Sequence, residues 1–571
     1  MWVQKALCRS NSLEQEQESM LMILVNWLYT GTTVFLLGCG FSAFSVKIFH
    51  YKLKRTDSLL MAGLVLATVY AQFYSLLGSV SLIANLLLVG ACLICLIACR
   101  KDILQILRGG VASYGPIKWI IVILLIGLWA FFTSRGYIHY DSDLYHGQSI
   151  RWIEEYGVVP GLGNLHERFA YNSSFFAVSA LYSMRFLLGE SLHSMSGFFA
   201  LVLSISALDI TKSWKRKKFL LSDYARAGAI YYLTTIIDEV VSPASDYSIM
   251  CVIFFIIIKW LDLLQEEEKE IAPYALLCVV GVYALTLKLT AGLVLLLLIK
   301  PAYLLIKEKR VREIILYICM GLVVAIPWFA RTVVISGWLV YPLPALDLFS
   351  FDWEMSAELM EIDAAQISAW GKALYNVALL DTPASVWIPN WFRTTLSGTE
   401  KLLILGCVGC IGLYLIGLVW MFVKKQWKHL DMALVLLTVI SSYLFWQMSA
   451  PLMRYGYAYV LLTDFLVLGW IVVRLGWNKL ESIVYGMLLL YGVYKLYPMG
   501  VYCYAYRNEP YYMWQQDYGT YELESYEIQG VTFYKPVSGD RTGYDYFPAG
   551  PVKANIELRG EGLKDGFLPK Q

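Results

Sequence analysis

The densest group of side chains suited to acid, base or metal chemistry lies in residues 137–157, YIHYDSDLYHGQSIRWIEEYG, in an otherwise mostly apolar chain. The stretch holds two aspartates, two glutamates, two histidines and one arginine. Asp141 and Asp143 are good caps for a helix that ends near Gly157, and a carboxylate there also interacts favourably with the helix dipole. One aspartate would meet that need, so we predict a functional role for at least one of the pair.

Two kinds of chemistry fit these residues. One carboxylate can act as general base for an acceptor hydroxyl while the second supports it by hydrogen bonding, without any ion. Alternatively, imidazole and carboxylate groups together bind divalent ions such as Mg²⁺ or Mn²⁺, and the side chains available for that are His139, Asp141, Asp143 and His146. The sequence requires no cofactor, and the spacing does not choose between the two alternatives.

A second group of candidates is cationic and falls at the ends of predicted membrane spans, where buried charge is costly and usually functional. Lys288 lies between two apolar segments, Arg331 follows a Pro-Trp pair at the end of a span, and Arg454 lies in the short turn SAPLMRYGY. Guanidinium groups bind phosphate through paired planar donors and stay charged. If the three cations converge at one surface, we expect them to bind a lipid phosphate.

Aromatic rings beside carboxylates offer apolar faces together with hydrogen-bond acceptors, a combination that suits a sugar. Such residues occur in segment 137–157 and in the loop YPLPALDLFSFDWEMSAELMEID, residues 341–363. The candidates for contact with a sugar or its acceptor are Tyr145, His146, Asp246 and Asp352.

The elements that position these residues are predicted to be transmembrane helices. Of the 571 residues, 58% are hydrophobic and only 16% are charged, far fewer than the roughly 25% typical of soluble domains. The net charge of +2 does not indicate a nucleic-acid partner. Apolar runs long enough to cross a bilayer predict an all-α polytopic protein with about fourteen transmembrane helices, near 21–46, 57–76, 79–99, 117–133, 191–210, 225–240, 247–264, 272–287, 289–306, 314–333, 401–423, 431–449, 456–475 and 481–499.

Lys and Arg cluster in alternate loops, which are expected to be cytoplasmic, and this places both termini outside. The apolar stretch 174–188 is then left over, and we interpret it as an amphipathic or re-entrant segment on the outer face. In the tail, YEIQGVTFYKP alternates like one strand and ANIELRG is a second, which predicts a small β-containing cap. The predicted organisation is transmembrane helices in 1–133, 191–333 and 401–499, an outer acidic loop with amphipathic helices in 134–190, a large outer loop in 334–400 and an outer tail in 500–571.

The layout resembles the GT-C superfamily of membrane glycosyltransferases, and most closely a group of bacterial polytopic membrane proteins without an assigned activity. The likeness covers most of residues 20–571. It rests on the acidic outer loop HYDSDLYH, on SPASDYS with Asp246, on LTLKLTAG with Lys288 and on PWFAR with Arg331. The chain differs from the general pattern in having three spans before the one that leads into the acidic loop.

The resemblance implies a GT-C-like fold and a transferase on the outer face of the bacterial cytoplasmic (inner) membrane. Its donor would be a polyprenyl-phosphate-linked sugar, and its acceptor a cell-surface glycan, lipid or protein. Asp141 or Asp143 would be the general base or a metal ligand, while Lys288, Arg331 and Arg454 would hold the donor phosphate. A one-step attack from the opposite face would invert the anomeric centre.

Three other functions stay open. A polyprenyl-diphosphate oligosaccharide polymerase or ligase would use similar cations with a longer outer groove. A lipid-linked-sugar flippase or transporter would line a path through the bilayer with polar residues, whereas here we expect the polar residues to concentrate toward one side. A noncatalytic scaffold of a glycan-assembly complex would tolerate substitution of both aspartates. Membrane lipids are expected partners in every case.

Overall fold

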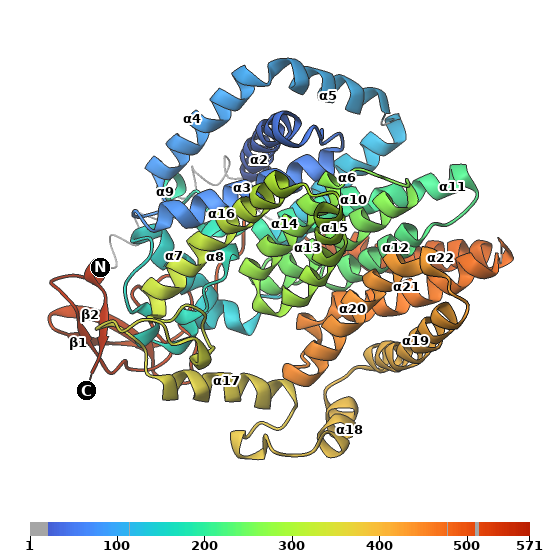
Figure 1. The fold of residues 1–571 in the computed structure, drawn as a ribbon. Helices are drawn as coiled ribbons and strands as arrows, with labels where there is room; N and C mark the ends of the chain where they lie inside the picture. The colour runs from blue at the N-terminus through green and yellow to red at the C-terminus, as the bar shows by residue number, and fades with distance from the viewer. Residues whose placement is uncertain (1–20, 114, 477, 509–512, 571) are drawn as a thin grey trace.

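The structure is a computed structural model that describes residues 21–113, 115–476, 478–508 and 513–570. Within these residues, ten helices are long and apolar enough to cross a membrane, so the chain is a polytopic, mainly helical membrane protein (Figure 1). They are α2 (Met22–Phe49), α3 (Thr56–Ser75), α6 (Pro116–Ser134), α10 (Met195–Ala207) with its extension to Arg216 through α11 (Lys212–Arg216), α13 (Ser245–Gln265), η5 (Leu289–Leu298) with α15 (Ile299–Lys307), α16 (Val311–Ser336), α19 (Gly398–Val423), α20 (Leu430–Ser449) and α21 (Tyr457–Leu475).

The other four predicted spans are also helical. Helix α4 (Leu82–Ala98) bends by 82° into the start of α5 (Arg100–Ser113). Helices α12 (Leu221–Thr235) and α14 (Ala272–Leu287) have 15 and 16 residues, fewer than the roughly 20 that a straight span needs. Helix α22 (Asn478–Ala505) covers the last of the four predicted spans, 481–499.

Close packing of α2 against α3 depends on two glycines. A Cβ added to Gly38 would clash with the carbonyl of Leu59, and one added to Gly63 would clash with the carbonyl of Val34. Small residues let two membrane helices approach until their backbones touch. Helix α3 also packs against α8 (Ser174–Tyr182) and α16.

The apolar stretch 174–188, which was not assigned to a span, is not an amphipathic surface helix. It forms α8 (Ser174–Tyr182) and the short α9 (Arg185–Leu188), and all nine residues of α8 are buried. Helix α8 packs against α3 and α7 (Gly147–Glu155), so it is part of the core. The amphipathic alternative was wrong because α8 has no exposed polar face: all nine residues are buried, and Ser174 pairs with Thr286 at 2.9 Å inside the protein. The re-entrant alternative stays a prediction.

The C-terminal tail contains the small β region predicted, but with a different first element. YEIQGVTFYKP belongs to a hairpin of β1 (Leu523–Ile528) and β2 (Val531–Pro536) rather than to one strand. Gln529 and Gly530 both have positive φ, 49° and 83°, which suits the two-residue turn of a hairpin. The second predicted strand is β3 (Ile556–Leu558), which pairs with β4 (Phe567–Pro569).

The tail lies beyond one end of the helix bundle, here called the tail end, on the side of α7 and away from α11 (Figure 1). The helices outside the spans include the π-helical turn η1 (Ser142–His146), which leads into α7, and α17 (Ala357–Gly371) and α18 (Ala384–Thr394) in the large loop. Trp152 of α7 is fully buried in a separate core with Phe533 and Phe567 of the tail.

Four polar side chains of α7 and η1 hold this tail: Asp143, Gln148, Arg151 and Glu154. The Asp143 carboxylate accepts hydrogen bonds from the Gly519 N–H at 3.0 Å and the Tyr521 hydroxyl at 2.8 Å. Gln148 donates to tail carbonyls at 2.8 and 3.1 Å, and Glu154 accepts from the Tyr544 hydroxyl at 2.7 Å. Docking the tail therefore explains much of the charge in segment 137–157.

Charged residues also gather at the opposite end of the bundle, which corrects the expectation that they concentrate toward one side. Asp57 lies 3.2 Å from Arg55 and also pairs with Lys259, while Arg226 pairs with Asp262 at 2.6 Å. Opposite charges offset part of the cost of burying each group. We call this end of the molecule the far end.

We predict that Asp143→Ala loosens the tail without disturbing the spans. The substitution removes the two hydrogen bonds that the carboxylate accepts from the Gly519 N–H and the Tyr521 hydroxyl, and each such bond contributes roughly 0.5–1.5 kcal/mol. Limited proteolysis should release the tail faster than in the wild type. The control is Glu522→Gln, whose side chain is exposed and should leave cleavage unchanged. Equal cleavage rates for Asp143→Ala and the wild type would contradict this docking.

Candidate functional site

Four separate turns at the tail end bring the candidate residues together. His139 and Asp141 follow α6, and Asp246 is in the first turn of α13. Lys288 lies in extended backbone between α14 and η5, and Arg454 lies in η9 (Met453–Tyr455) between α20 and α21. The predictions that Lys288 joins two apolar helices and that Arg454 lies in a short turn are confirmed.

Backbone hydrogen bonds fix the loop that carries Asp141. The His139 N–H donates to the Ser242 hydroxyl at 2.7 Å, and the Tyr137 N–H donates to the Asp238 carbonyl at 2.6 Å. Both acceptors lie in the turn that precedes α13. The loop is therefore held against the helix end that presents Asp246.

Arg454 is the centre of the cluster. Its guanidinium donates to Asp141 at 2.6 Å, lies 3.4 Å from Asp246 and contacts the His139 ring. Lys288 pairs with the other oxygen of Asp246 and stands 3.3 Å from the centre of the Tyr455 ring. We call these five residues, His139, Asp141, Asp246, Lys288 and Arg454, the Arg454 cluster. The exposed fraction of their side chains ranges from 8% for Asp246 to 22% for Lys288. They are thus sheltered but still open to a ligand.

The charges of this cluster set its protonation states. Burial alone would raise the pKa of Asp141, but Arg454, with smaller effects from His146 and His139, outweighs it and lowers the pKa to about 2. Burial and the nearby Arg454 both lower the pKa of His139. At neutral pH, Asp141 is therefore ionised and His139 is neutral.

Arg168 is a candidate that the sequence analysis missed. It lies in η3 (Glu167–Ala170), and its guanidinium stands 5.8 Å from the centre of the Tyr145 ring. In the part of the chain that the structure describes, this guanidinium makes no hydrogen bond or ion pair, yet its charge helps to lower the pKa of Asp141. The charge of Arg168 is balanced only at longer range, by Asp141 and Asp363, so its guanidinium is suited to an anionic ligand.

The sequence analysis also missed Asp363, whose carboxylate lies close enough to Arg168 to act on its charge. It is 2% exposed and accepts hydrogen bonds from the hydroxyls of Tyr171 at 2.7 Å and Tyr341 at 3.0 Å. These bonds join α17 to segment 134–190. Apart from lying in loops predicted to be outside, neither Arg168 nor Asp363 carries a sequence signal.

Arg331 does not join Lys288 and Arg454. It is 2% exposed, donates to Asn172 at 2.9 Å and contacts Ser75. The next residue after Asn172, Ser173, donates to the carbonyl of Leu287 at 2.8 Å, immediately before Lys288. Arg331 thus braces the segment beside Lys288 without entering the cluster.

The remaining predicted residues divide between the cluster and other places. Tyr145 faces the cluster beside Arg168, and His146 is buried behind it, 3% exposed. Asp143 binds the tail, and Asp352 pairs with Arg559 at 2.8 Å on the surface of the tail.

The four side chains predicted as possible metal ligands are not arranged to coordinate one ion. Arg454 bonds to Asp141, while the oxygens of Asp143 are used by the tail. Among the described residues, no group of three or more His, Cys, Asp or Glu side chains is arranged to hold a metal.

A comparison with protein families finds one described as a domain of unknown function (DUF8201), whose model matches residues 20–461. The matched range contains the whole Arg454 cluster and ends before the tail. No curated protein and no solved structure matches the chain.

The low pKa of Asp141 predicts a pH-dependent contribution to stability. The pKa of Asp141 in the folded state, about 2, lies below the ordinary aspartate value of 3.8. The ion pair therefore stabilises the fold fully above about pH 4, and this contribution is lost as pH falls toward 2. The shift corresponds to about 2 kcal/mol. In detergent, wild type should therefore melt above Asp141→Asn at pH 6, and the difference should shrink between about pH 4 and 2. A difference that stays constant over this range would contradict the assignment.

Proposed function

We propose that this chain, which belongs to the DUF8201 family, is a membrane glycosyltransferase whose donor is a polyprenyl-phosphate-linked sugar. The observation that carries the proposal is the convergence of Lys288 and Arg454 beside an ionised Asp141, from separate turns, in a sheltered site at one end of the bundle. Transfer from a glycosyl phosphate needs cations to stabilise the leaving phosphate and a carboxylate to deprotonate the acceptor.

The cations of the site support an anionic donor. Lys288 and Arg454 pair with Asp141 and Asp246, whereas the Arg168 guanidinium makes no ion pair within the described residues. A glycosyl phosphodiester carries one negative charge, which Arg168 could compensate without breaking an existing pair. Buried sites favour such compensation because unpaired charge is costly there.

The proposed reaction follows from this arrangement. Asp141 takes the proton of an acceptor hydroxyl, and the resulting oxygen attacks the anomeric carbon. A C–O glycosidic bond forms as the bond from carbon to phosphate oxygen breaks, and the phosphate leaves with the electron pair. Lys288 and Arg454 stabilise the negative charge that develops on the phosphate. Attack from the face opposite the phosphate inverts the anomeric configuration.

Donor binding would also make Asp141 a stronger base. Without donor, Arg454 holds the pKa of Asp141 low against the opposing effect of burial. A phosphate that shares Arg454 weakens this field, so burial then raises the pKa of Asp141. The base would thus gain proton affinity when the donor is in place.

We further propose a GT-C arrangement with fourteen spans, which counts α4, α12, α14 and α22 as well. The site would lie on the outer face of the bacterial inner membrane, with both termini outside. The alternation of basic and acidic loops supports this orientation. The acceptor would be a cell-surface glycan, lipid or protein.

The donor is tested by mass spectrometry of lipids that co-purify with wild type and Asp141→Asn. We expect a polyprenyl-phosphate monosaccharide to be enriched in the variant, because donor binds but transfer stalls. Asp352→Asn, which changes a carboxylate outside the cluster, should match wild type. A diphosphate-linked oligosaccharide would favour the polymerase, ligase or flippase alternatives, and ordinary phospholipids alone in every sample would overturn the donor assignment.

Arg168 is predicted to bind the donor phosphate. Arg168→Met should weaken the binding of a polyprenyl monophosphate in detergent by about tenfold or more, the effect of one charge-assisted hydrogen bond. Lys288→Met should weaken it similarly, whereas Asp352→Asn should not. Unchanged binding by Arg168→Met would remove this residue from the site.

A further inference from the structure

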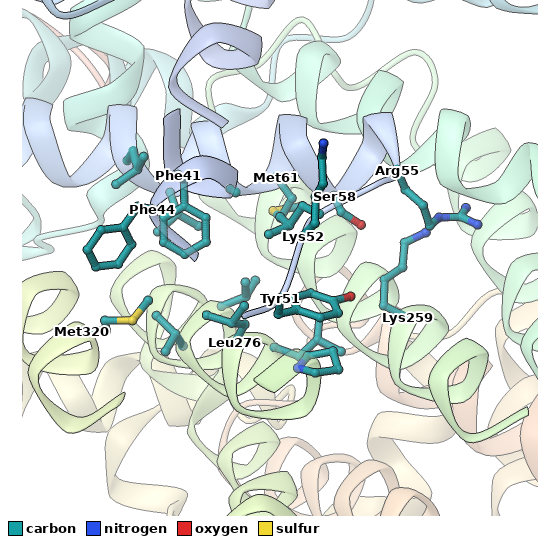
Figure 2. Close-up of a pocket in the computed structure, with 18 of the residues that line it drawn as sticks. Phe41, Phe44, Tyr51, Lys52, Arg55, Ser58, Met61, Lys259, Leu276 and Met320 are labelled. Atoms are coloured by element: carbon teal, nitrogen blue, oxygen red, sulfur yellow. The ribbon is translucent and has the colours of Figure 1, made fainter. Parts of the chain in front are cut away.

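A cavity of about 820 Å³ lies at the far end of the bundle, between α2, α3, α13, α14 and α16 (Figure 2). Small-molecule sites usually measure about 300–1,000 Å³. Helix α13 contributes Asp246 to the Arg454 cluster and Glu266, just after its last turn, to the cavity. Twenty residues of helix span about 30 Å, so the two sites are distinct.

The cavity is apolar along most of its length and charged at one end. Figure 2 shows the rings of Phe41 and Phe44 at one side and the side chains of Arg55 and Lys259 at the other, with Tyr51 between them. Phe44 is 46% exposed on the bundle surface, where bilayer chains would contact it. This polarity fits an amphipathic ligand with its chains between the helices.

Most cations at the charged end are already compensated. Arg55 and Lys259 share Asp57, and Lys52 pairs with Asp102 at 2.7 Å. Arg55 and Lys259 are therefore poor candidates to bind an added anion.

Three other charged residues at the cavity mouth are not paired. Within the described ranges, Lys54 makes no ion pair, and neither do Glu266 and Glu268. The mouth therefore offers one cation and two carboxylates that have no ion pair. The Glu268 carboxylate accepts one hydrogen bond, from the Glu270 N–H at 3.0 Å, and keeps further acceptor capacity.

We infer that this cavity binds an aminophospholipid, a lipid whose headgroup joins a phosphate to a primary ammonium. Lys54 would contact the phosphate, Glu266 and Glu268 would accept hydrogen bonds from the ammonium, and the acyl chains would lie against Phe41 and Phe44. A phosphoglycerol headgroup offers no cation to the two glutamates. A choline headgroup carries the charge but has no N–H to donate.

Native mass spectrometry of the full chain in detergent tests this, with equimolar phosphatidylethanolamine, phosphatidylcholine and phosphatidylglycerol of identical acyl chains as probes. We expect phosphatidylethanolamine to be retained about tenfold better than phosphatidylglycerol, as for one charge-assisted hydrogen bond. Glu266→Gln combined with Glu268→Gln should abolish this preference. The matched control is Glu267→Gln, an exposed neighbour that does not line the cavity and should keep it.

A second variant tests the location of the acyl chains. Ala62 lines the apolar part of the cavity, so Ala62→Phe should fill it and reduce retention of all three lipids. Equal retention of the three lipids by wild type, or an unchanged preference in the double glutamate variant, would overturn the inference. The outcome is independent of the proposed transferase, since no substituted residue touches the Arg454 cluster.

Discussion

The ion pairs of Arg454 with Asp141 and Asp246 are the interaction on which the site depends. These three side chains come from segments far apart in the sequence, and a buried guanidinium is tolerated only where carboxylates surround it. The pairs therefore constrain where the turn after α20, the first turn of α13 and the loop after α6 can lie. Lys288 adds a fourth segment through Asp246.

The tail shows how one polar segment can serve two purposes. In the stretch that begins at His139, Asp141 turns toward Arg454, whereas Asp143, two residues later, turns toward Gly519 and Tyr521. The π-helical turn η1 begins between them. The family match ends before the tail, so the partners of Asp143 lie outside the matched range while the Arg454 cluster lies inside it.

Much of the fold could be predicted because apolar runs and loop charges are local signals, and all fourteen predicted ranges are helical. Lys288 and Arg454 were found because charge is rare at span ends. Arg168 could not be found from the sequence, because it lies in a short 3-10 turn that has no periodic pattern. Only its position near Asp141 in the folded chain makes it a candidate. The partners of Asp143 lie about 376 residues away along the chain, a contact that no local pattern predicts.

Helix α13 connects these observations, because ion pairs hold both of its ends. Asp246 binds Lys288 and Arg454 at one end, and Lys259 binds Asp57 at the other. A helix pinned at both ends cannot slide without breaking buried pairs, which is costly. In the proposed transferase, a donor phosphate would therefore be accommodated by exchange of side-chain partners rather than by helix movement. Arg454 can release Asp141 to the acceptor and still keep Asp246, and the proton that Asp141 takes from the acceptor hydroxyl then neutralises its carboxylate.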